Sequence, residues 1–237
     1  MQKQVDILAF GAHADDVEIG MGGTIAKYAD NGANIVICDL TKAELSSNGT
    51  VELRLKEAET AGKVLGITER VNANLPDRGL YMKEEYVSCI VSIIRTYKPK
   101  LVFAPYMMDR HPDHGHCAKL VEEACFSAGI RKYNAHKDEQ VHRIDALYYY
   151  MINGFHKPDF VVDISGYWDQ KVKSLQAYKS QFEDTNNSFK TPLTDGYIDS
   201  VMAREKMMGK EVGVRYAEGF FSTKPLLLSN DLLGGKE

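Results

Sequence analysis

Short apolar runs alternate along the chain with longer segments whose apolar residues recur at helical spacing. The runs predict buried strands and the longer segments predict helices, two of which end just before Gly32 and Gly66. The predicted strands cover residues 5–10, 35–40, 71–73, 101–104, 146–151 and 160–162, and the predicted helices cover residues 22–31, 51–65, 83–97, 115–127, 167–182 and 198–212. Strands that alternate with helices form a mostly parallel sheet covered on both faces. The pattern therefore predicts an α/β fold, a Rossmann-like three-layer sandwich built as a single domain over residues 1–237.

Composition and charge narrow the partners that such a domain would take. Hydrophobic residues make up 44% of the chain and charged residues 26%, as in ordinary soluble globular proteins. The net charge of -4 and the pI near 6.0 argue against a broad basic face, so neither nucleic acid nor a membrane is expected as a partner. No signal peptide is recognisable at the start and no apolar run reaches the about 18 residues that span a bilayer, which favours a cytoplasmic location. The four cysteines lack CxxC spacing, so we expect reduced thiols.

Two loops that follow predicted strands carry most of the reactive side chains. Residues 11–16 follow the first strand and bring one histidine and two aspartates. Residues 109–114 follow the strand that ends at Ala104 and bring two histidines and two more aspartates. In parallel α/β sheets the ligand lies outside the carboxyl ends of the strands, so we expect both loops to open on the same edge.

The spacing within these loops fits a metal centre. His13 and Asp16 are three residues apart, which lets both side chains reach one point at a turn or helix start. His111 and His114 repeat that spacing around a proline that restricts the turn. Zinc accepts nitrogen and carboxylate oxygen together, and three protein ligands with an open position are typical of a catalytic site. Two histidines and one carboxylate would leave further groups for catalysis.

Other interpretations of the same residues stay open. An aspartate pair such as Asp15 and Asp16 is also common at a helix N-terminus, where it stabilises the first turn. The opening strand, loop and helix are also compatible with a nucleotide-binding module, but both glycine-rich phosphate motifs are missing and two carboxylates would repel phosphate. A metal-binding protein without catalysis is a third alternative, in which Asp15 and His111 would have no use.

The residues of the two loops resemble the signature motifs of a known enzyme family. Residues 12–16 with Glu18 and Gly20, together with residues 111–114, are similar to the motifs of the PIG-L or LmbE-like zinc deacetylases. Positions in between also agree with that family: Leu40, Thr41, Arg54, Glu57 and Ala58. Residues 41–50 resemble the branch of bacillithiol-biosynthesis deacetylases, and Ala43 stands there where many relatives of the wider family have glycine.

The resemblance implies a metal centre with defined ligands. His13, Asp16 and His114 would bind zinc, at one ion per chain. Iron or another divalent ion also suits a mixed imidazole and carboxylate site, so the metal stays open. Asp15, beside the metal, would act as the general base that takes a proton from water.

The resemblance also implies roles for side chains around the metal. His111, oriented by Asp113, would help to stabilise the oxyanion. Either Asp15 or His111 would protonate the leaving amine. Arg54 would bind the sugar of the substrate. Tyr197 is the candidate for a catalytic tyrosine carried by a mobile loop, with a packing role as the alternative.

The branch that the chain resembles also implies a substrate. Enzymes of that branch remove the N-acetyl group from N-acetyl-alpha-D-glucosaminyl L-malate, and the alternative is another N-acetylglucosamine conjugate or a chitobiose-like sugar. Malate carries two carboxylates, so an acidic chain must offer a local cation. Arg110, beside the second motif, is the candidate, unless it forms an ion pair with Asp109 or Asp113. The resemblance further implies a homo-oligomer, with a hexamer as one such form.

Overall fold

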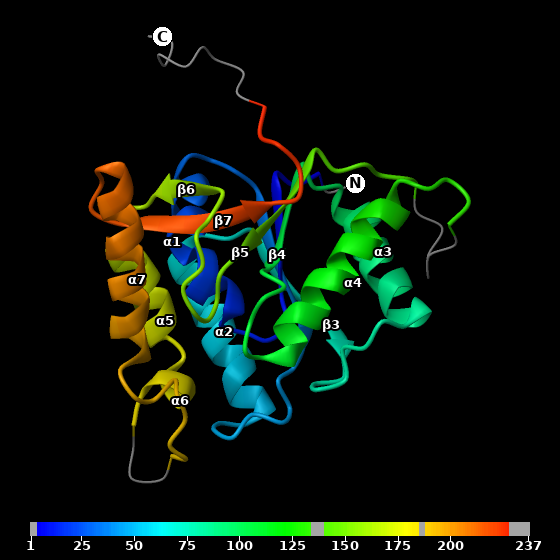
Figure 1. The fold of residues 1–237 in the computed structure, drawn as a ribbon. Helices are drawn as coiled ribbons and strands as arrows, with labels where there is room; N and C mark the ends of the chain where they lie inside the picture. The colour runs from blue at the N-terminus through cyan, green and yellow to red at the C-terminus, as the bar shows by residue number, and fades with distance from the viewer. Residues whose placement is uncertain (1–3, 134–139, 185–187, 228–237) are drawn as a thin grey trace.

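A computed structural model describes residues 4–133, 140–184 and 188–227 of the chain. Its centre is a seven-stranded sheet with the strand order β3-β2-β1-β4-β5-β7-β6 (Figure 1). The strands are β1 (Ile7–Gly11), β2 (Ile35–Thr41), β3 (Glu69–Leu75), β4 (Leu101–Pro105), β5 (Ala146–Tyr150), β6 (Phe160–Asp163) and β7 (Ala217–Ser222). The first five strands run parallel, whereas β7 runs antiparallel to both β5 and β6. The mostly parallel sheet that the sequence predicts is confirmed.

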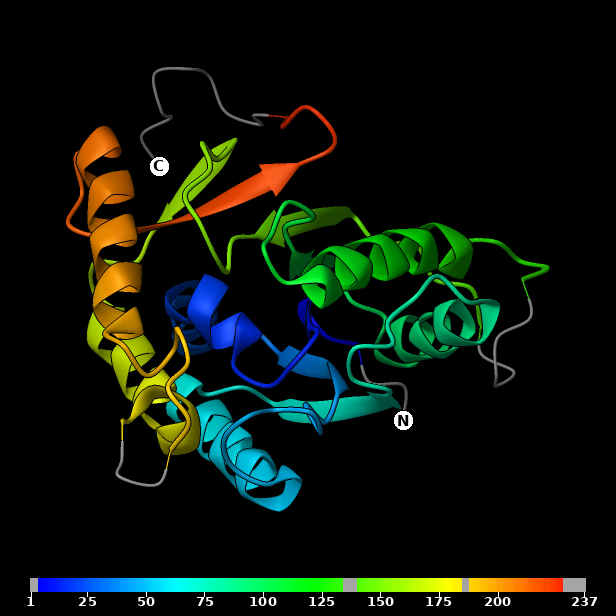
Figure 2. The ribbon, with the colours of Figure 1, turned by 60° about the horizontal axis from the view of Figure 1, so that its bottom comes forward.

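Helices cover both faces of the sheet (Figures 1 and 2). They are α1 (Asp16–Asp30), α2 (Val51–Leu65), α3 (Glu84–Tyr97), α4 (Pro112–Ala128), α5 (Trp168–Gln176), α6 (Lys179–Phe182) and α7 (Tyr197–Val212). α3 and α4 lie on one face, and α1, α2, α5 and α7 lie on the other. Successive residues of β1 alternate between the two apolar cores, with Leu8 in the core under α3 and α4 and Ile7 in the core under α1 and α2. The predicted three-layer sandwich is therefore confirmed.

The strand order creates a crevice between β1 and β4. From β1 the chain moves outward through β2 to β3, and β4 then returns to pair with the opposite side of β1. The loops after β1 and β4 therefore diverge at the carboxyl edge, which is where ligands bind in open α/β sheets. These are the two loops that carry the reactive residues, so the prediction that they open on one edge is confirmed.

Three elements differ from the sequence prediction. α1 starts at Asp16, whereas the prediction started it at residue 22. The sequence prediction missed the first turns because their acidic residues and glycines interrupt the apolar pattern of a helix. The helix predicted over residues 167–182 is two helices, because the chain leaves helical torsion angles at the buried Tyr178 (φ −87°, ψ 61°). β7 is absent from the prediction because Glu218, a buried charged residue of this strand, interrupts its apolar pattern.

Gly20 of α1 lies where the helix touches β5 closely. A Cβ atom there would lie 2.1 Å from Cδ2 of Tyr150, a fully buried ring whose hydroxyl group donates to the Phe10 carbonyl oxygen at 2.6 Å. Because that ring is fully buried and hydrogen-bonded, it has little room to move away. We therefore expect Gly20→Ala to lower the free energy of unfolding by about 1–3 kcal/mol, the usual cost of overpacking. Thermal unfolding would measure the change. Gly166→Ala is the matched control, since no atom lies within 4 Å of the added methyl group, and equal melting temperatures for the two variants would contradict the argument.

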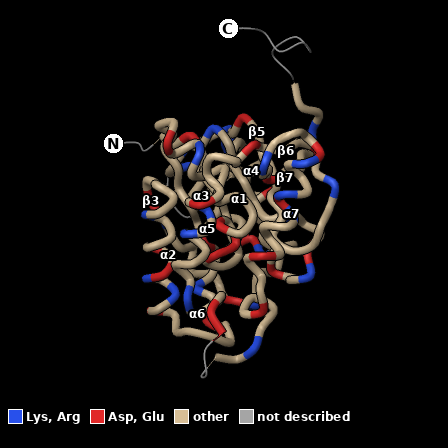
Figure 3. The backbone as a smooth tube through the Cα atoms, turned by 90° about the vertical axis from the view of Figure 1, so that its left-hand side faces the viewer, with Lys and Arg blue, Asp and Glu red and all other residues tan. Residues whose placement is uncertain are grey.

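Charged residues of both signs are distributed along the backbone. Figure 3 shows lysines and arginines interspersed with acidic residues on the side that faces the viewer. We therefore expect individual arginines, rather than a basic face, to bind an anionic ligand. Within the described ranges, no helix is long and apolar enough to cross a membrane.

Candidate metal and catalytic site

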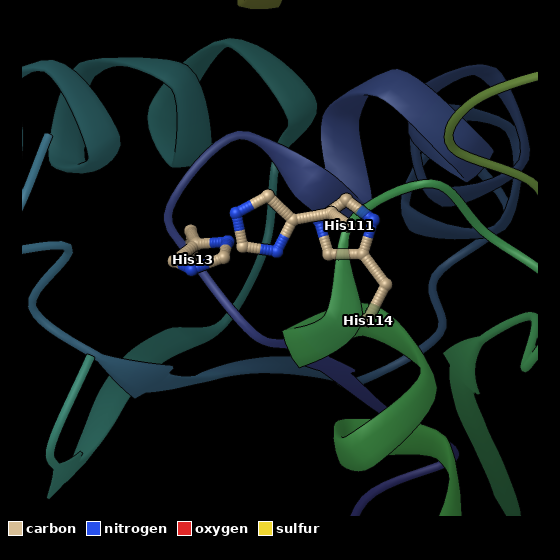
Figure 4. A group of neighbouring side chains, drawn as sticks. All are labelled: His13, His111 and His114. Carbon is tan, nitrogen blue, oxygen red and sulfur yellow. The ribbon is translucent and has the colours of Figure 1, made fainter. Parts of the chain in front are cut away.

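The three side chains predicted as metal ligands meet at the carboxyl edge of β1 and β4. His13 lies in the loop after β1, Asp16 begins α1, and His114 lies in the first turn of α4; all three are buried. The Asp16 carboxylate contacts both imidazoles, with Oδ1 3.1 Å from His114 Nε2 and Oδ2 3.6 Å from His13 Nδ1. Figure 4 shows the ring of His111 beside the other two rings, and each histidine has a nitrogen within 4.8 Å of the others.

The charges around these residues favour a bound cation. Against the penalty of burial, His114 and His13 hold the pKa of Asp16 well below its usual range, so its carboxylate is ionised. Although burial lowers it, Asp16 and Asp109 raise the pKa of His114 to about 9. Carboxylates thus stabilise positive charge at this point, and a metal ion that replaced the imidazole protons would meet the same field. The cluster of histidines and aspartates is able to bind a metal ion.

Each predicted histidine ligand has a carboxylate beside its second nitrogen. His114 Nδ1 lies 3.0 Å from Asp109 Oδ1. His13 Nε2 lies 3.3 Å from Asp77 Oδ1 and 3.6 Å from Asp113 Oδ2. A carboxylate in that position fixes the tautomer of a ligating histidine and the direction of its ring. Sequence reasoning missed Asp77 and gave Asp109 no such role, although Asp77 follows β3 and could have been found among the loops after parallel strands.

Asp15 lies beside the predicted ligands and contacts an arginine. Its Oδ2 accepts a hydrogen bond from Arg54 Nη2 at 3.0 Å, and the same guanidinium donates to the Ala14 carbonyl oxygen. Burial raises the pKa of Asp15 to about 7, against the effect of Arg54 and with a further contribution from the Asp16 charge. A carboxylate whose pKa lies near neutrality suits a general base. Asp15 makes no side-chain capping hydrogen bond to α1, so the alternative role as a helix cap gains no support.

His111 is the N-cap of α4, which fixes the direction of its ring. Its Nδ1 accepts a hydrogen bond from the Asp113 backbone N–H at 3.3 Å, so the proton of the neutral ring is on Nε2. Burial, together with the charges of His13 and His114, lowers the pKa of His111 to about 4. Asp113 thus orients His111 through its backbone, while its carboxylate accepts the Arg78 backbone N–H at 2.8 Å. The ring is a neutral donor next to the predicted ligands.

A pocket of about 280 Å³ surrounds this site, lined by the loops after all five parallel strands. Tyr197, at the start of α7, lies in its wall, where its hydroxyl oxygen is 3.1 Å from the Ile152 carbonyl oxygen and 2.9 Å from Asn153 Oδ1, two acceptors for its single proton. Burial raises the pKa of Tyr197, so its phenol stays protonated. Asn153 in turn donates from Nδ2 to Asp109 at 3.0 Å, which connects Tyr197 to the partner of His114.

Three arginines line the pocket and differ in their partners. Arg54 is held by Asp15, as described above. The half-exposed side chain of Arg78 lies 3.3 Å from Asp113 Oδ1. Arg110 is exposed and forms no ion pair with any residue that the structure describes. The ion pair with Asp109 or Asp113 that the sequence left open is therefore not formed.

Three non-glycine residues that line the pocket have left-handed backbone torsion angles. They are Asp15 (φ 105°), Ala43 (φ 51°) and Arg78 (φ 57°). Such conformations cost about 1–3 kcal/mol each and are commonly found at functional sites. Glycine would adopt the positive φ of Ala43 without strain.

Known proteins are similar in sequence to most of this chain. The family model described as PIG-L, GlcNAc-PI de-N-acetylase, matches residues 8–125. The chain is also 31% identical over 229 residues to the diacetylchitobiose deacetylase of Thermococcus kodakarensis, an alignment that covers 90% of this chain and 81% of the relative. The chain belongs to the PIG-L family. The residues matched by the PIG-L model contain both motif loops, whereas Asn153 and Tyr197 lie beyond them.

Two solved structures extend the PIG-L similarity to the whole fold. The conserved protein TT1542 from Thermus thermophilus superimposes with a TM-score of 0.87 at 35% identity, covering 95% of this chain and 97% of that one. The N,N'-diacetylchitobiose deacetylase from Pyrococcus horikoshii, in complex with its inhibitor MPG, superimposes with a TM-score of 0.76 at 25% identity, covering 91% of this chain and 82% of that one. The α/β fold around the site is therefore common to these proteins.

Proposed function

We propose that this PIG-L chain is a zinc-dependent hydrolase that removes the acetyl group from N-acetylglucosaminides. The observation that carries the proposal is the meeting of His13, Asp16 and His114 in one pocket with Asp15, whose pKa is about 7. The names of the matched family and of the two matched deacetylases support hydrolysis of the same amide bond, because each name describes removal of an acetyl group from a glucosamine derivative.

The residues present fit a zinc ion. Imidazole nitrogen and carboxylate oxygen suit zinc, and His13, Asp16 and His114 would hold it, although iron would also bind such a set. When bound, the ion supplies Lewis acidity, which polarises the acetyl carbonyl group and makes water a stronger acid. Asp77 and Asp109 would keep the two imidazoles in the orientation that leaves their other nitrogens facing Asp16.

The proton transfers of amide hydrolysis fall to Asp15 in this proposal. Its carboxylate takes the proton of the attacking water, and the hydrogen bond from Arg54 orients that carboxylate toward the pocket. His111 donates from Nε2 to the acetyl oxygen as negative charge develops there, a contact typically worth about 100- to 1,000-fold in turnover. The neutral state of His111 supports Asp15 as the group that returns the proton to the leaving amine, before the C–N bond breaks to give acetate. The Tyr197 hydroxyl group is a second candidate donor to the acetyl oxygen.

The substrate that we favour is N-acetylglucosaminyl malate, the substrate of the bacillithiol branch. Arg110 supports an anionic aglycone because it lines the pocket without an ion-pair partner among the described residues. Arg54 would then contact the sugar. A chitobiose-like sugar is the second candidate, which the two matched chitobiose deacetylases favour. A cytoplasmic location and a homo-oligomer such as a hexamer remain part of the proposal, and size-exclusion chromatography with light scattering would test the oligomer.

An acetate-release assay on three substrates tests the proposal. We expect zinc-loaded protein to hydrolyse N-acetylglucosaminyl malate faster than diacetylchitobiose or N-acetylglucosamine. Arg110→Gln is expected to raise KM for the malate conjugate by about 10- to 100-fold, the value of a charge-assisted hydrogen bond of roughly 1.5–3 kcal/mol, and to leave KM for diacetylchitobiose unchanged. Arg131→Gln, an exposed arginine outside the pocket lining, is the matched control. Equal effects of Arg110→Gln on both substrates would exclude the malate assignment, and no acetate from any substrate would exclude the deacetylase.

A further inference from the structure

Helix α1 is broken just behind the metal site. At Met21 its torsion angles (φ −147°, ψ 21°) are not helical, so the segment of residues 16–20 is separated from the rest of the helix. Around the break, the Ile19 carbonyl oxygen and the backbone N–H groups of residues 23–24 bond to side chains of other elements. Glu218 of β7 accepts those two N–H groups at 2.9 and 2.7 Å. Side chains of other elements therefore hold the segment that begins with a metal ligand.

Arg204 of α7 is one of the side chains that fill the break. Its Nη2 donates to the Ile19 carbonyl oxygen at 3.3 Å, where Lys171 Nζ also donates at 2.8 Å. Its Nη1 donates at 2.6 Å to the Ile152 carbonyl oxygen, which also accepts the Tyr197 hydroxyl group. Ile19 and Ile152 both line the pocket. One buried guanidinium thus joins two walls of the pocket.

Each of these two walls is connected to one of the proposed metal ligands. The first carbonyl belongs to the short helical segment that begins at Asp16. The second belongs to Ile152, and the next residue, Asn153, donates from its backbone and from Nδ2 to the Asp109 carboxylate, at 3.0 Å in both cases. Asp109 Oδ1 in turn lies 3.0 Å from His114 Nδ1. Contacts from Arg204 therefore lead to the helical segment of Asp16 on one side and, through Asn153 and Asp109, to His114 on the other.

We infer that Arg204 is a positioning residue that fixes Asp16 and His114 relative to each other and so determines the affinity of the site for its metal ion. An arginine suits this task because its planar fork points two N–H groups at two acceptors in fixed directions, whereas a lysine presents a single ammonium group. Glu205 and Glu218 balance the charges of Arg204 and Lys171 within the buried cluster. The inference rests on the proposed function, because it uses the ligands proposed there.

Arg204→Lys tests this role, since it keeps the charge and removes the fork. We expect the dissociation constant for zinc to rise by about 10- to 100-fold, as when other groups that orient metal ligands are replaced. Competition between metal-free protein and a chromogenic chelator measures it without any substrate. We also expect kcat for acetate release to fall while KM stays nearly constant. Val201→Ala is the matched control, because this buried residue of the same helix belongs to the apolar core and its truncation lowers the melting temperature alone.

Chemical rescue separates positioning from general stability. In Arg204→Ala, added guanidinium at millimolar concentration is expected to restore part of the zinc affinity, whereas it should not change that of Val201→Ala. Wild-type zinc affinity in Arg204→Lys would overturn the inference, as would an equal loss of affinity in Val201→Ala. If wild-type protein binds zinc but releases no acetate from any acetylated glucosaminide, the proposed function fails, while the expected changes in zinc affinity would still uphold the role of Arg204.

Discussion

Replacing Asp15 with asparagine is expected to lower kcat for acetate release by about 100- to 10,000-fold, the usual contribution of a positioned general base. The amide has the size of the carboxylate and can still accept the hydrogen bond from Arg54, which is 3.0 Å long in the native protein, but it cannot take a proton from water. Asparagine also tolerates the left-handed backbone at this position (φ 105°) better than alanine does. Steady-state kinetics on the preferred substrate would measure the loss.

Zinc content separates the two roles that Asp15 could have. Asp15 is not among the proposed ligands, so the asparagine variant should bind as much zinc as the wild type. Asp30→Asn is a matched control on the same helix, because the Asp30 carboxylate accepts from the Tyr167 hydroxyl group at the opposite end of α1. Wild-type turnover in Asp15→Asn would exclude Asp15 as the base, and a loss of zinc from that variant would make Asp15 a ligand instead.

Removal of divalent ions by a chelator is expected to abolish acetate release, and one equivalent of zinc per chain should restore it. The reason is that the ion supplies the Lewis acidity that amide hydrolysis requires at neutral pH, which no other group in the pocket replaces. Adding back iron or cobalt in parallel would identify the metal that supports turnover. Full turnover by protein that atomic absorption finds free of metal would contradict the metal dependence.

Substitution of a single proposed metal ligand tests whether the metal binds at this site. His114→Ala is expected to lose stoichiometric zinc together with activity, because it removes one of three proposed protein ligands and leaves Asp16 without its contact at 3.1 Å. His156→Ala is the matched control, since the ring of His156 packs against Tyr106 and Phe221. If both variants kept their zinc, the ion would have to bind outside the cluster.

Elements whose ends carry local signals could be predicted closely from the sequence. α2 covers residues 51–65 both in the prediction and in the structure. Its start is fixed by the Thr50 side chain, which accepts the Leu53 backbone N–H, and its end by Gly66 at φ 75°. The start of α1 lacks such a signal because its first turns carry the residues of the site. After its break at Met21, the backbone N–H groups of residues 23–24 bond to Glu218, which lies almost two hundred residues away in the chain.

The sequence by itself determined the candidate site, because the residue types and the short spacing of residues such as His13 and Asp16 predict a metal centre, and the family resemblance implies its ligands and its base. It also determined the alternation of strands and helices. Only the tertiary structure decided which carboxylates stand behind the histidines, since Asp77 lies 64 positions from His13 and reaches it through the order of strands in the sheet. The neutral state of His111 and the two-sided contact of Arg204 depend likewise on burial and on carbonyl groups of distant segments. Local patterns report the neighbours of a residue along the chain, whereas sheet topology sets its neighbours in space.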